Sequence, residues 1–315
     1  MPRVKPSVTI TVRDLLDNLG KELDLRVVAG EKGLGRPIAV AEVNRPGLSL
    51  TGWQKYFAKR RLQVLGKVEA YYLRQLSARL RRHRINRLLE MPIPAFIVTR
   101  NYLPPPELIE GGNACNVPIL RTPAVTMRVI NKLSLWLEDQ FAPSTIVHGV
   151  LMEVHGVGVL IMGKASVGKS ECALGLIERG HILVADDVVK LKVAEGQYLT
   201  GYTNQQLGHH MEIRGIGIIN VQSLFGVRSV RLWKHVDFVV TLEAWQEGTD
   251  YDRLGIDRST VEILGVSLPN VIIPVKPGRD LALLIETAAQ NEKLRTLGVN
   301  VAEQFNKHLI ATMRQ

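Results

Sequence analysis

An eight-residue segment with the sequence GKASVGKS has the residue types and spacing needed to bind phosphate. It matches the pattern G-x-x-x-x-G-K-[ST] at every fixed position. Its two fixed glycines allow the backbone to curl so that successive N–H groups face a phosphate. Its lysine would reach the β- and γ-phosphate oxygens, and its last hydroxyl could bind Mg²⁺. The predicted nucleotide-binding residues are Gly163, Lys164, Ala165, Ser166, Val167, Gly168, Lys169 and Ser170.

The flanking sequence supplies the elements that would position this loop. The apolar run Val159–Met162 predicts a strand that enters it, and Glu171–Arg179 predicts a helix that ends at Gly180. The positive end of the helix dipole would then lie at the phosphate. This context favours a functional loop over a glycine-containing turn that matches by accident.

Two adjacent acids follow soon after the loop. The segment His181–Ala185 predicts a buried strand that ends in Asp186 and Asp187, and Asp187 lies 18 residues beyond Lys169. An aspartate at a strand end beside a phosphate-binding loop can hold Mg²⁺ or orient a nucleophile. Because adjacent carboxylates repel, one of them could have a raised pKa and act as a base. An acidic turn that caps the next element is the alternative interpretation.

Composition limits the class of protein. With 315 residues, 46% of them hydrophobic and 22% charged, the chain can bury two cores and is not a disordered protein. No apolar run approaches the roughly 20 residues of a membrane span, and the N-terminus shows no secretory signal. Two cysteines, Cys115 and Cys172, cannot form a disulfide framework, so we expect reduced thiols and a cytoplasmic protein.

The order of predicted elements divides the chain into two α/β domains. Strands alternate with helices over roughly the first 125 residues, with one helical stretch over Val68–Glu90, and a linker is expected near Ala142. From Thr145 onward the pattern is dense in β-structure, which indicates a mixed sheet. We expect one strand over Ile146–Val154 and a hairpin through His155–Gly156. The predicted domains are residues 1–134 and 135–315.

Several ordered blocks of the sequence resemble the bacterial HPr kinase/phosphorylase family. In the N-terminal half the similar segments are Asn44–Leu48, Leu50–Trp53 and Gln63–Lys67. In the C-terminal half they are His148–Leu151, Gly156–Ile161, Gly168–Glu171, Arg179–His181, Val184–Asp187, Glu212–Val221, Arg253–Gly255 and Pro274–Arg279. The resemblance therefore spans nearly the whole chain.

The resemblance implies a bifunctional enzyme. Such an enzyme phosphorylates a serine of the phosphocarrier protein HPr with ATP or pyrophosphate, in the presence of Mg²⁺, and regulates carbon metabolism. It also removes the phosphate by phosphorolysis, in which inorganic phosphate attacks and pyrophosphate forms. The implied architecture is an N-terminal α/β domain and a C-terminal P-loop kinase domain with a phosphoenolpyruvate-carboxykinase-like mixed sheet, assembled as a homohexamer.

The resemblance also implies roles for individual residues. Lys169 would stabilise developing charge, and Ser170 with Glu212 would bind Mg²⁺. Asp187 would take the proton from the HPr serine and return it in the reverse reaction. His148 and Arg253 match the remaining catalytic positions, and Met211–Asn220 would serve both directions. The dephosphorylation segment would consist of Pro274, Val275, Lys276, Pro277, Gly278 and Arg279.

One departure from the family pattern lies in the loop. The family's loop usually reads G-x-S-G-x-G-K-S, whereas this chain has Ala165 and Ser166 where Ser-Gly is expected. If position 166 requires a positive φ, a serine there costs about 1–2 kcal/mol.

A basic segment, defined here as residues 59–88, supplies most of the positive charge. It contains ten Lys/Arg and one acid, a net charge of +9 against +10 for the whole chain. This segment raises one other function, a nucleotide-sensing regulator that binds DNA through it. A P-loop kinase of a small molecule is a further alternative, which rests on the phosphate-binding motif. More often such a run is the solvated face of a helix, so we do not expect nucleic acid as a partner.

Overall fold

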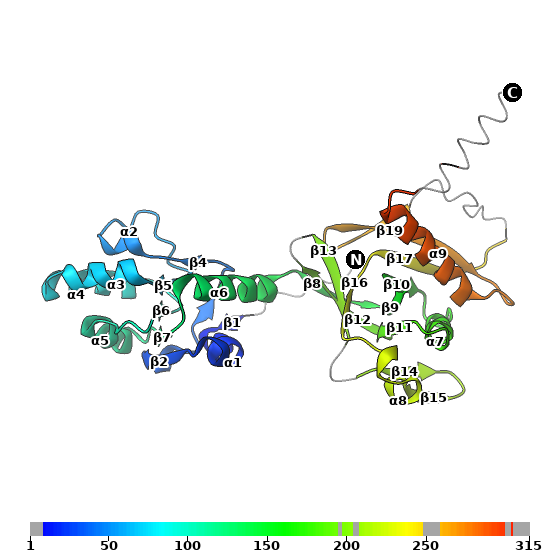
Figure 1. The fold of residues 1–315 in the computed structure, drawn as a ribbon, viewed down its shortest axis with the longest axis horizontal. Helices are drawn as coiled ribbons and strands as arrows, with labels where there is room; N and C mark the ends of the chain where they lie inside the picture. Colours follow the sequence, from blue (N-terminus) through cyan, green and yellow to red (C-terminus); the bar gives the residue numbers. More distant parts are fainter. Residues whose placement is uncertain (1–8, 195–196, 204–207, 248–258, 300–303, 305–315) are drawn as a thin grey trace, which may run out of the picture. The chain divides into compact units, whose positions relative to one another are not determined.

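The computed structural model describes residues 9–194, 197–203, 208–247, 259–299 and 304 of the chain. Within these residues the chain forms two compact units, and the boundary between them in the sequence lies between Phe141 and Ala142 (Figure 1). The linker expected near Ala142 lies at this junction. The predicted domain boundary after residue 134 falls inside helix α6, and it stays a prediction.

The N-terminal unit is an α/β sandwich built on a five-stranded sheet with strand order β2-β7-β6-β5-β4. The strands of the whole unit, of which β1 and β3 lie outside this sheet, are β1 (Ile10–Thr11), β2 (Arg26–Ala29), β3 (Pro37–Ile38), β4 (Val43–Asn44), β5 (Leu62–Leu65), β6 (Phe96–Val98) and β7 (Ile119–Arg121). Its helices are α1 (Val12–Leu23), α2 (Gly47–Leu50), α3 (Lys67–Gln75), α4 (Ala78–Leu89), α5 (Pro106–Cys115) and α6 (Thr126–Phe141), with a 3₁₀ turn η1 (Glu31–Gly33).

Alternation along the strands of this sheet creates two cores. Ile97 packs with α1 and α6 on one face, whereas its neighbours Phe96 and Val98 pack with α3, α4 and α5 on the other. The predicted helical stretch over Val68–Glu90 is two helices, because Ser77 interrupts it: its hydroxyl accepts the Leu80 N–H at 3.4 Å and caps α4.

The C-terminal unit contains a six-stranded mixed sheet, a four-stranded antiparallel sheet and a two-stranded ribbon, with strand orders β11-β9-β10-β17-β19-β18, β16-β13-β12-β8 and β14-β15. The strands through the loop region are β8 (Ser144–His148), β9 (Val150–Val154), β10 (Val157–Gly163), β11 (Ile182–Ala185), β12 (Val188–Ala194) and β13 (Tyr198–Tyr202). The later strands are β14 (His210–Ile213), β15 (Gly217–Asn220), β16 (Trp233–His235), β17 (Phe238–Ala244), β18 (Ser259–Ile263) and β19 (Val266–Val275). The helices are α7 (Lys169–Glu178), α8 (Val221–Phe225) and α9 (Leu281–Thr296), with a 3₁₀ turn η2 (Val227–Ser229).

The six-stranded sheet is covered on both faces. Helices α7 and α9 pack on one face around Val159 and Phe238, and the four-stranded sheet packs on the other around Leu160 and Val239. Because neighbouring residues of β10 and β17 face opposite ways, both strands are apolar almost throughout. The predicted mixed α/β architecture is therefore confirmed.

One predicted strand is wrong in a way that matters for the site. Residues 146–154 do not form one strand, because the chain turns at Gly149 from β8 in the four-stranded sheet into β9 in the six-stranded sheet. A Cβ at Gly149 would lie 2.7 Å from the carbonyl oxygen of Ile161, so the corner packs directly against β10. The hairpin through His155–Gly156 is confirmed, because β9 and β10 pair antiparallel on either side of it.

Candidate active site

The site begins at a corner where two neighbouring strands pass from one sheet into the other. Strands β9 and β11 pair in the six-stranded sheet, and their continuations β8 and β12 pair in the four-stranded sheet. At the crossing, the Gly149 N–H donates to the carbonyl oxygen of Asp187 at 3.1 Å, and Val188 is in register with His148. The corner thus brings the family-implied catalytic residues His148 and Asp187 together.

The corner also determines which way the two acids point. The Val188 N–H donates to the carbonyl oxygen of Asp186 at 2.7 Å, closing a tight turn in which Asp187 has φ 62°. Aspartate tolerates this left-handed conformation better than most residues do. Asp186 and Asp187 therefore project differently, although they are adjacent in the chain.

The glycine-rich loop (residues 163–170) joins β10 to α7 at the same edge of the sheet. Gly163 has φ 148°, and a Cβ there would lie 2.5 Å from the carbonyl oxygen of Leu242 on β17. Gly168 has φ 97° and precedes the first residue of α7. Both fixed glycines of the motif are therefore required by the backbone, and the N-terminus of α7 opens at the loop.

Lys169 places its ammonium group over the loop. Nζ donates to the carbonyl oxygens of Gly163 at 3.2 Å and Lys164 at 3.1 Å. Among the residues that the structure describes, Lys169 has no carboxylate partner within salt-bridge distance. Its charge is thus available to an anion.

Ser170 contacts the first of the two acids. Its hydroxyl lies 3.1 Å from Oδ1 and 3.3 Å from Oδ2 of Asp186. Burial raises the pKa of the Asp186 carboxyl to about 6, and the hydrogen bond from Ser170 partly opposes that rise. A desolvated carboxylate next to a hydroxyl is a favourable place for a cation.

Asp187, in contrast, is open to solvent. Its side chain is 79% exposed, and Oδ1 lies 3.7 Å from Nδ1 of His148, which is 81% exposed. Exposure of both groups leaves room for a macromolecular substrate to bring a hydroxyl to this carboxylate. The imidazole at 3.7 Å can orient the carboxylate and stabilise its charge when protonated.

The ribbon β14–β15 contributes two further side chains to the site. Glu212 lies on β14, and Arg214 follows it at the tip, where the guanidinium donates a hydrogen bond to the hydroxyl of Ser166. Ser166 has φ 68°, so the left-handed conformation that would penalise a serine is present at this position. The ribbon is therefore attached to the loop at Ser166, one of the two positions where the chain departs from the family pattern.

These groups line a single open cleft of about 300 Å³. The lining residues are His148, Gly163, Ala165, Ser166, Gly168, Lys169, Ser170, Glu171, Asp186, Asp187, Glu212 and Arg214. The cleft thus holds a glycine-rich loop, a lysine, an arginine and several carboxylates, a set of groups that suits phosphoryl transfer.

The cleft does not include every residue expected from the sequence. Arg253 lies outside the described residues. The segment Pro274–Arg279 begins with the last two residues of β19 and continues past its end. Strand β19 lies beyond β17 from β10, two strand spacings or about 10 Å along the sheet edge. Within that segment Arg279 donates to the carbonyl oxygen of Pro274 at 3.2 Å, and the Lys276 ammonium lies 5.3 Å from the ring centre of Trp245.

The places of Arg214, Asp186 and Asp187 in the site depend on the three-dimensional arrangement. Arg214 could be identified as charged from the sequence, but its attachment to Ser166 depends on how the ribbon folds back. Asp186 and Asp187 form one acidic pair in the sequence, and the positive φ at Asp187 separates their directions. The loop motif is the sequence signal that lies nearest to these three residues in the folded chain.

The basic segment (residues 59–88) folds into β5, α3 and α4 of the N-terminal unit, and part of its charge is paired. Arg81 bonds to Glu107 of α5 at 2.8 and 2.9 Å, and Arg82 bonds to Glu110 of α5 at 2.9 Å. Both acids lie outside the basic segment, so these ion pairs between α4 and α5 neutralise part of its net charge of +9.

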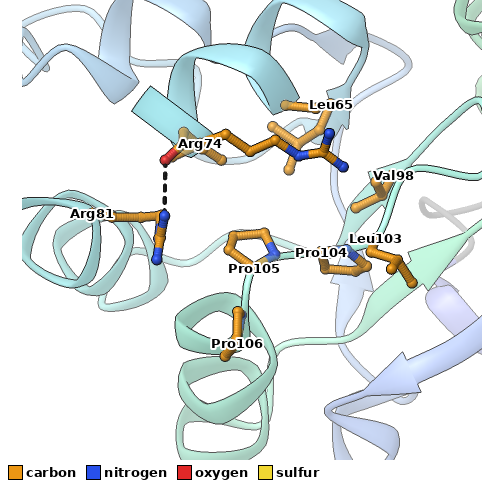
Figure 2. Close-up of a pocket in the computed structure, with 10 residues that line it drawn as sticks. Leu65, Arg74, Arg81, Val98, Leu103, Pro104, Pro105 and Pro106 are labelled. Carbon is orange, nitrogen blue, oxygen red and sulfur yellow. Dashed lines mark hydrogen bonds between the residues drawn. The ribbon is translucent and has the colours of Figure 1, made fainter. Parts of the chain in front are cut away.

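A hollow of about 220 Å³ lies next to this pairing, between α3 and the loop that precedes α5. Figure 2 shows Arg74 opposite the proline run 104–106. Arg81 donates to the carbonyl oxygen of Leu73 at 3.2 Å. The walls of the hollow are mostly apolar, and they include Leu65, Leu73, Val98 and Leu103. The hollow lacks a glycine-rich loop and carboxylates, so it does not duplicate the cleft of the C-terminal unit.

Known proteins match this chain over almost its whole length. Residues 10–137 match the family described as "HPr Serine kinase N terminus", and residues 139–309 match "HPr Serine kinase C-terminal domain". "HPr kinase/phosphorylase 1" of Oceanobacillus iheyensis is 46% identical over 300 residues, covering 95% of this chain and 96% of that protein. The chain belongs to the HPr kinase/phosphorylase family. It is therefore an enzyme of the kinase class, and the resemblance seen in the sequence motifs is confirmed.

Other members of the family are similar over comparable lengths. "HPr kinase/phosphorylase" of Bacillus subtilis is 43% identical over 289 residues, covering 92% of this chain and 93% of that protein. A solved structure of the Hpr(Ser) kinase/phosphatase from Coxiella burnetii is 38% identical and has a TM-score of 0.47, covering 51% of this chain and 98% of that chain. Among the described residues of the present chain, no helix has both the length and the apolar character to cross a bilayer.

Proposed function

We propose that this chain phosphorylates a serine of the phosphocarrier protein HPr, using ATP or pyrophosphate with Mg²⁺, and removes that phosphate by phosphorolysis. The observation that supports it best is the convergence of two pairs in one cleft. Ser170 lies 3.1 Å from Asp186 beside the loop, and His148 lies 3.7 Å from the exposed Asp187. The names of the relatives supply the protein substrate and both directions of the reaction.

In this proposal the loop (residues 163–170) binds the β-phosphate of ATP or pyrophosphate. The N–H groups around Gly163 and Gly168 and the N-terminus of α7 face the anion. Lys169 moves from the loop carbonyls to the phosphate oxygens and stabilises the charge that develops during transfer. Arg214, next to the loop through Ser166, is a second cation on the same side.

The donor set of the cleft suits Mg²⁺. The Ser170 hydroxyl and the carboxylates of Asp186 and Glu212 are oxygen donors, and a hard cation prefers oxygen. We propose that Ser170 and Glu212 hold the ion and that Asp186 orients Ser170. When bound, Mg²⁺ would neutralise charge on the phosphate oxygens. A cation here would also favour the ionised form of Asp186, which burial disfavours.

In the forward direction Asp187 acts as the general base. Its carboxylate takes the proton of the serine hydroxyl while the serine oxygen bonds to the terminal phosphorus. The bond from that phosphorus to the bridging oxygen breaks, so ADP or phosphate leaves. His148 positions Asp187, and Arg253, which lies outside the described residues, is proposed to stabilise charge.

In the reverse direction the same carboxyl acts as the general acid. An oxygen of inorganic phosphate attacks the phosphorus of phosphoserine, and the bond to the serine oxygen breaks. Asp187 gives its proton to the departing serine oxygen, and pyrophosphate forms. We assign the segment Pro274–Arg279 mainly to this direction, in agreement with its place at the same sheet edge as the loop.

The proposal also covers the core of the C-terminal unit, the location of the enzyme, its regulatory role and its assembly. We propose a phosphoenolpyruvate-carboxykinase-like P-loop core for the C-terminal unit, a cytoplasmic location, a role in the regulation of carbon metabolism, and a homohexamer. The hexamer would have a mass of about 210 kDa, six times the 35.1 kDa of the chain. Light scattering of the purified protein measures that mass directly.

Incubation with HPr tests the function. With labelled ATP and Mg²⁺ we expect label on one HPr serine, and addition of unlabelled inorganic phosphate to the isolated phosphoprotein should release labelled pyrophosphate. An HPr variant with that serine replaced by alanine is the control. Label transfer to water or to a small molecule, with none on HPr, would contradict the proposal.

A further inference from the structure

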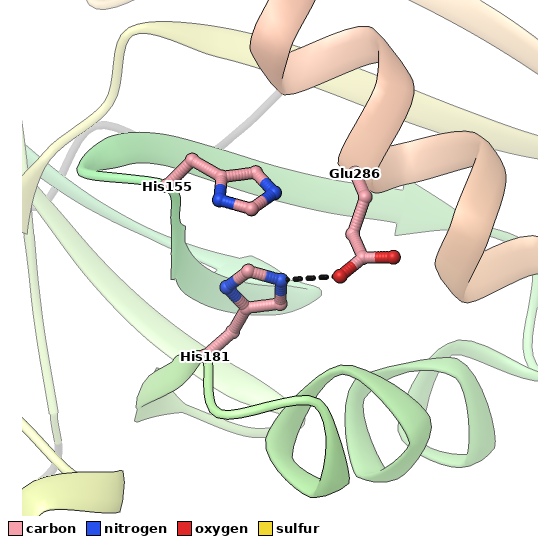
Figure 3. A group of neighbouring side chains, drawn as sticks. All are labelled: His155, His181 and Glu286. Atoms are coloured by element: carbon pink, nitrogen blue, oxygen red, sulfur yellow. Dashed lines mark hydrogen bonds and ion pairs between the residues drawn. The ribbon is translucent and has the colours of Figure 1, made fainter.

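A cluster of two histidines and one glutamate lies apart from the catalytic cleft. This His–His–Glu cluster consists of His155 in the β9–β10 turn, His181 just before β11, and Glu286 on α9. Figure 3 shows the three side chains converging, and one ligating atom of each lies within 4.8 Å of the other two. The turn precedes β10 and the glycine-rich loop follows it, so the cluster lies at the opposite end of that strand.

The backbone and α9 hold His155 in place. His155 and Gly156 have φ values of 51° and 86°, positive at both central residues, as a type I′ hairpin turn requires. From α9, the Lys293 ammonium donates to the carbonyl oxygen of His155 at 2.9 Å, and Nε2 of Gln290 lies 3.1 Å from Nε2 of His155. The imidazole is thus fixed toward α9 although it is exposed.

His181 and Glu286 are already in contact. His181 is only 7% exposed, and its Nε2 lies 2.7 Å from Oε1 of Glu286. The His155 and His181 rings meet edge to face, with ring centres 4.7 Å apart. Two imidazoles and one carboxylate from three separate elements are therefore gathered before any ligand binds.

The charge of the surroundings permits a cation. Arg179 bonds to Oε2 of Glu286 at 2.9 Å and to Asp280 at 2.5 Å, so one guanidinium serves two carboxylates. Two further cations bond to the turn. Lys293 is exposed and bonded to the carbonyl oxygen of His155, so water screens its charge. Lys234 donates to the carbonyl oxygen of Gly156 at 2.6 Å, and its charge is paired with Glu153 at 3.6 Å. Arg179 can stay on Oε2 and orient the carboxylate while Oε1 changes its partner.

We propose that His155, His181 and Glu286 form a binding site for a divalent transition-metal ion of the zinc class. Zinc takes imidazole nitrogens and carboxylate oxygens at about 2.0–2.2 Å, so ligand atoms around one ion lie about 3–4 Å apart. The cluster approaches this spacing, and binding replaces the His181–Glu286 hydrogen bond with two bonds to the ion. Imidazole ligands select against Mg²⁺, which the oxygen-lined cleft suits.

Such an ion would link three parts of the C-terminal unit. Helix α9 begins at Leu281, directly after the segment Pro274–Arg279, and β11 ends at the acids of the cleft. The ion would join α9 to the β9–β10 turn and to the start of β11. This site is independent of the proposed HPr reaction, so the failure of either proposal leaves the other standing.

Titration of the full-length chain with Co²⁺, and then with Zn²⁺ in competition, tests the site. We expect one Co²⁺ per chain with the intense visible absorption of a four-coordinate site, displaced by Zn²⁺ and not by Mg²⁺. His155→Asn should weaken Co²⁺ binding by at least about tenfold. Asparagine suits the left-handed turn and an Asn-Gly hairpin, so this variant keeps the fold.

Two further variants make the test specific. His83→Ala removes an exposed histidine of α4 in the other unit and should leave Co²⁺ affinity unchanged. Glu286→Gln should weaken binding as His155→Asn does. The absence of saturable binding at one ion per chain would overturn the proposal, as would an unchanged Co²⁺ affinity in His155→Asn.

Discussion

The hydroxyl of Ser170 lies 3.1 Å from Oδ1 of Asp186, so the first turn of α7 is attached to the end of β11. Strand β9 lies between β10 and β11, and α7 crosses it to connect the two parallel neighbours. Both strands therefore end at the same sheet edge. The short sequence distance between the loop and the acids is a direct result of this crossover.

Replacing Asp186, the partly buried acid of the pair, should weaken the response to Mg²⁺. Asp186→Asn keeps an oxygen that can accept from Ser170 but removes the negative charge. We expect kinase activity to fall by about 10²-fold, with half-maximal activity at a higher Mg²⁺ concentration. A Mg²⁺ titration of the reaction rate measures both effects, with Asp17→Asn on α1 as the control. An unchanged Mg²⁺ dependence would contradict the proposed role of Asp186 in orienting Ser170 toward the ion.

Ser166 allows backbone strain to be separated from the contact with Arg214. Ser166→Gly and Ser166→Ala both remove the hydroxyl that accepts from Arg214, but only glycine relieves the φ of 68°. The glycine variant should be more stable than the alanine variant by about 1 kcal/mol. Denaturant unfolding compares the two. Equal stabilities would mean that position 166 is not strained in solution.

The corner at Gly149 should not tolerate a side chain. In Gly149→Ala the new Cβ would lie 2.7 Å from the carbonyl oxygen of Ile161, so we expect a loss of about 1–3 kcal/mol in unfolding free energy. Activity should fall as well, because the corner places His148 beside Asp187. Gly20→Ala in α1 meets nothing within 4 Å and should be neutral or stabilise by up to about 1 kcal/mol. Equal unfolding free energies in the two variants would contradict the packing at the corner.

The Arg81–Glu107 pair should make the N-terminal unit sensitive to acid. The hydrogen bond from Arg81 lowers the pKa of Glu107 from its ordinary 4.5, so the ionised form is favoured in the folded state. The stabilisation is therefore complete above about pH 4.5 and is lost as the pH falls through the lowered pKa. At pH 7, Glu107→Gln should reduce the unfolding free energy by about 2 kcal/mol, and this difference should shrink toward pH 3.

The neighbouring pair on the same two helices provides the control. Arg82 and Glu110 are both 58% exposed, so Glu110→Gln should change the unfolding free energy by less than about 0.5 kcal/mol. Urea unfolding of the N-terminal unit from pH 7 to pH 3 measures both variants. A constant difference between wild type and Glu107→Gln across this range would contradict the lowered pKa.

Local sequence rules predicted the elements whose signals are local. The loop motif with its strand and helix, and the His155–Gly156 hairpin, follow from periodicity and turn residues close in sequence. The path of the chain from one sheet into the other does not follow from such local signals. The run Ile146–Val154 is apolar on both sides of Gly149, so its periodicity does not show that the chain turns there. The close approach of Gly149 to the carbonyl oxygen of Ile161 on the paired strand β10 is seen only in the structure.

The site was predictable in its parts rather than in its arrangement. The resemblance named Asp187, Lys169 and Ser170, but the separate directions of the two acids depend on a positive φ that the sequence does not specify. The His–His–Glu cluster was not visible at all, because its members are dispersed over more than a hundred residues.

The variant Asp187→Asn tests the central claim most directly, since it replaces the proposed base with a neutral group of the same shape that also tolerates φ 62°. The measurement is the rate of HPr phosphorylation and of phosphorolysis, together with nucleotide affinity, in the variant and the wild type. We predict nucleotide affinity within about twofold of wild type and a loss of at least about 10²-fold in both transfers. Transfer in either direction at a rate close to wild type would contradict the assignment of Asp187 as base and acid.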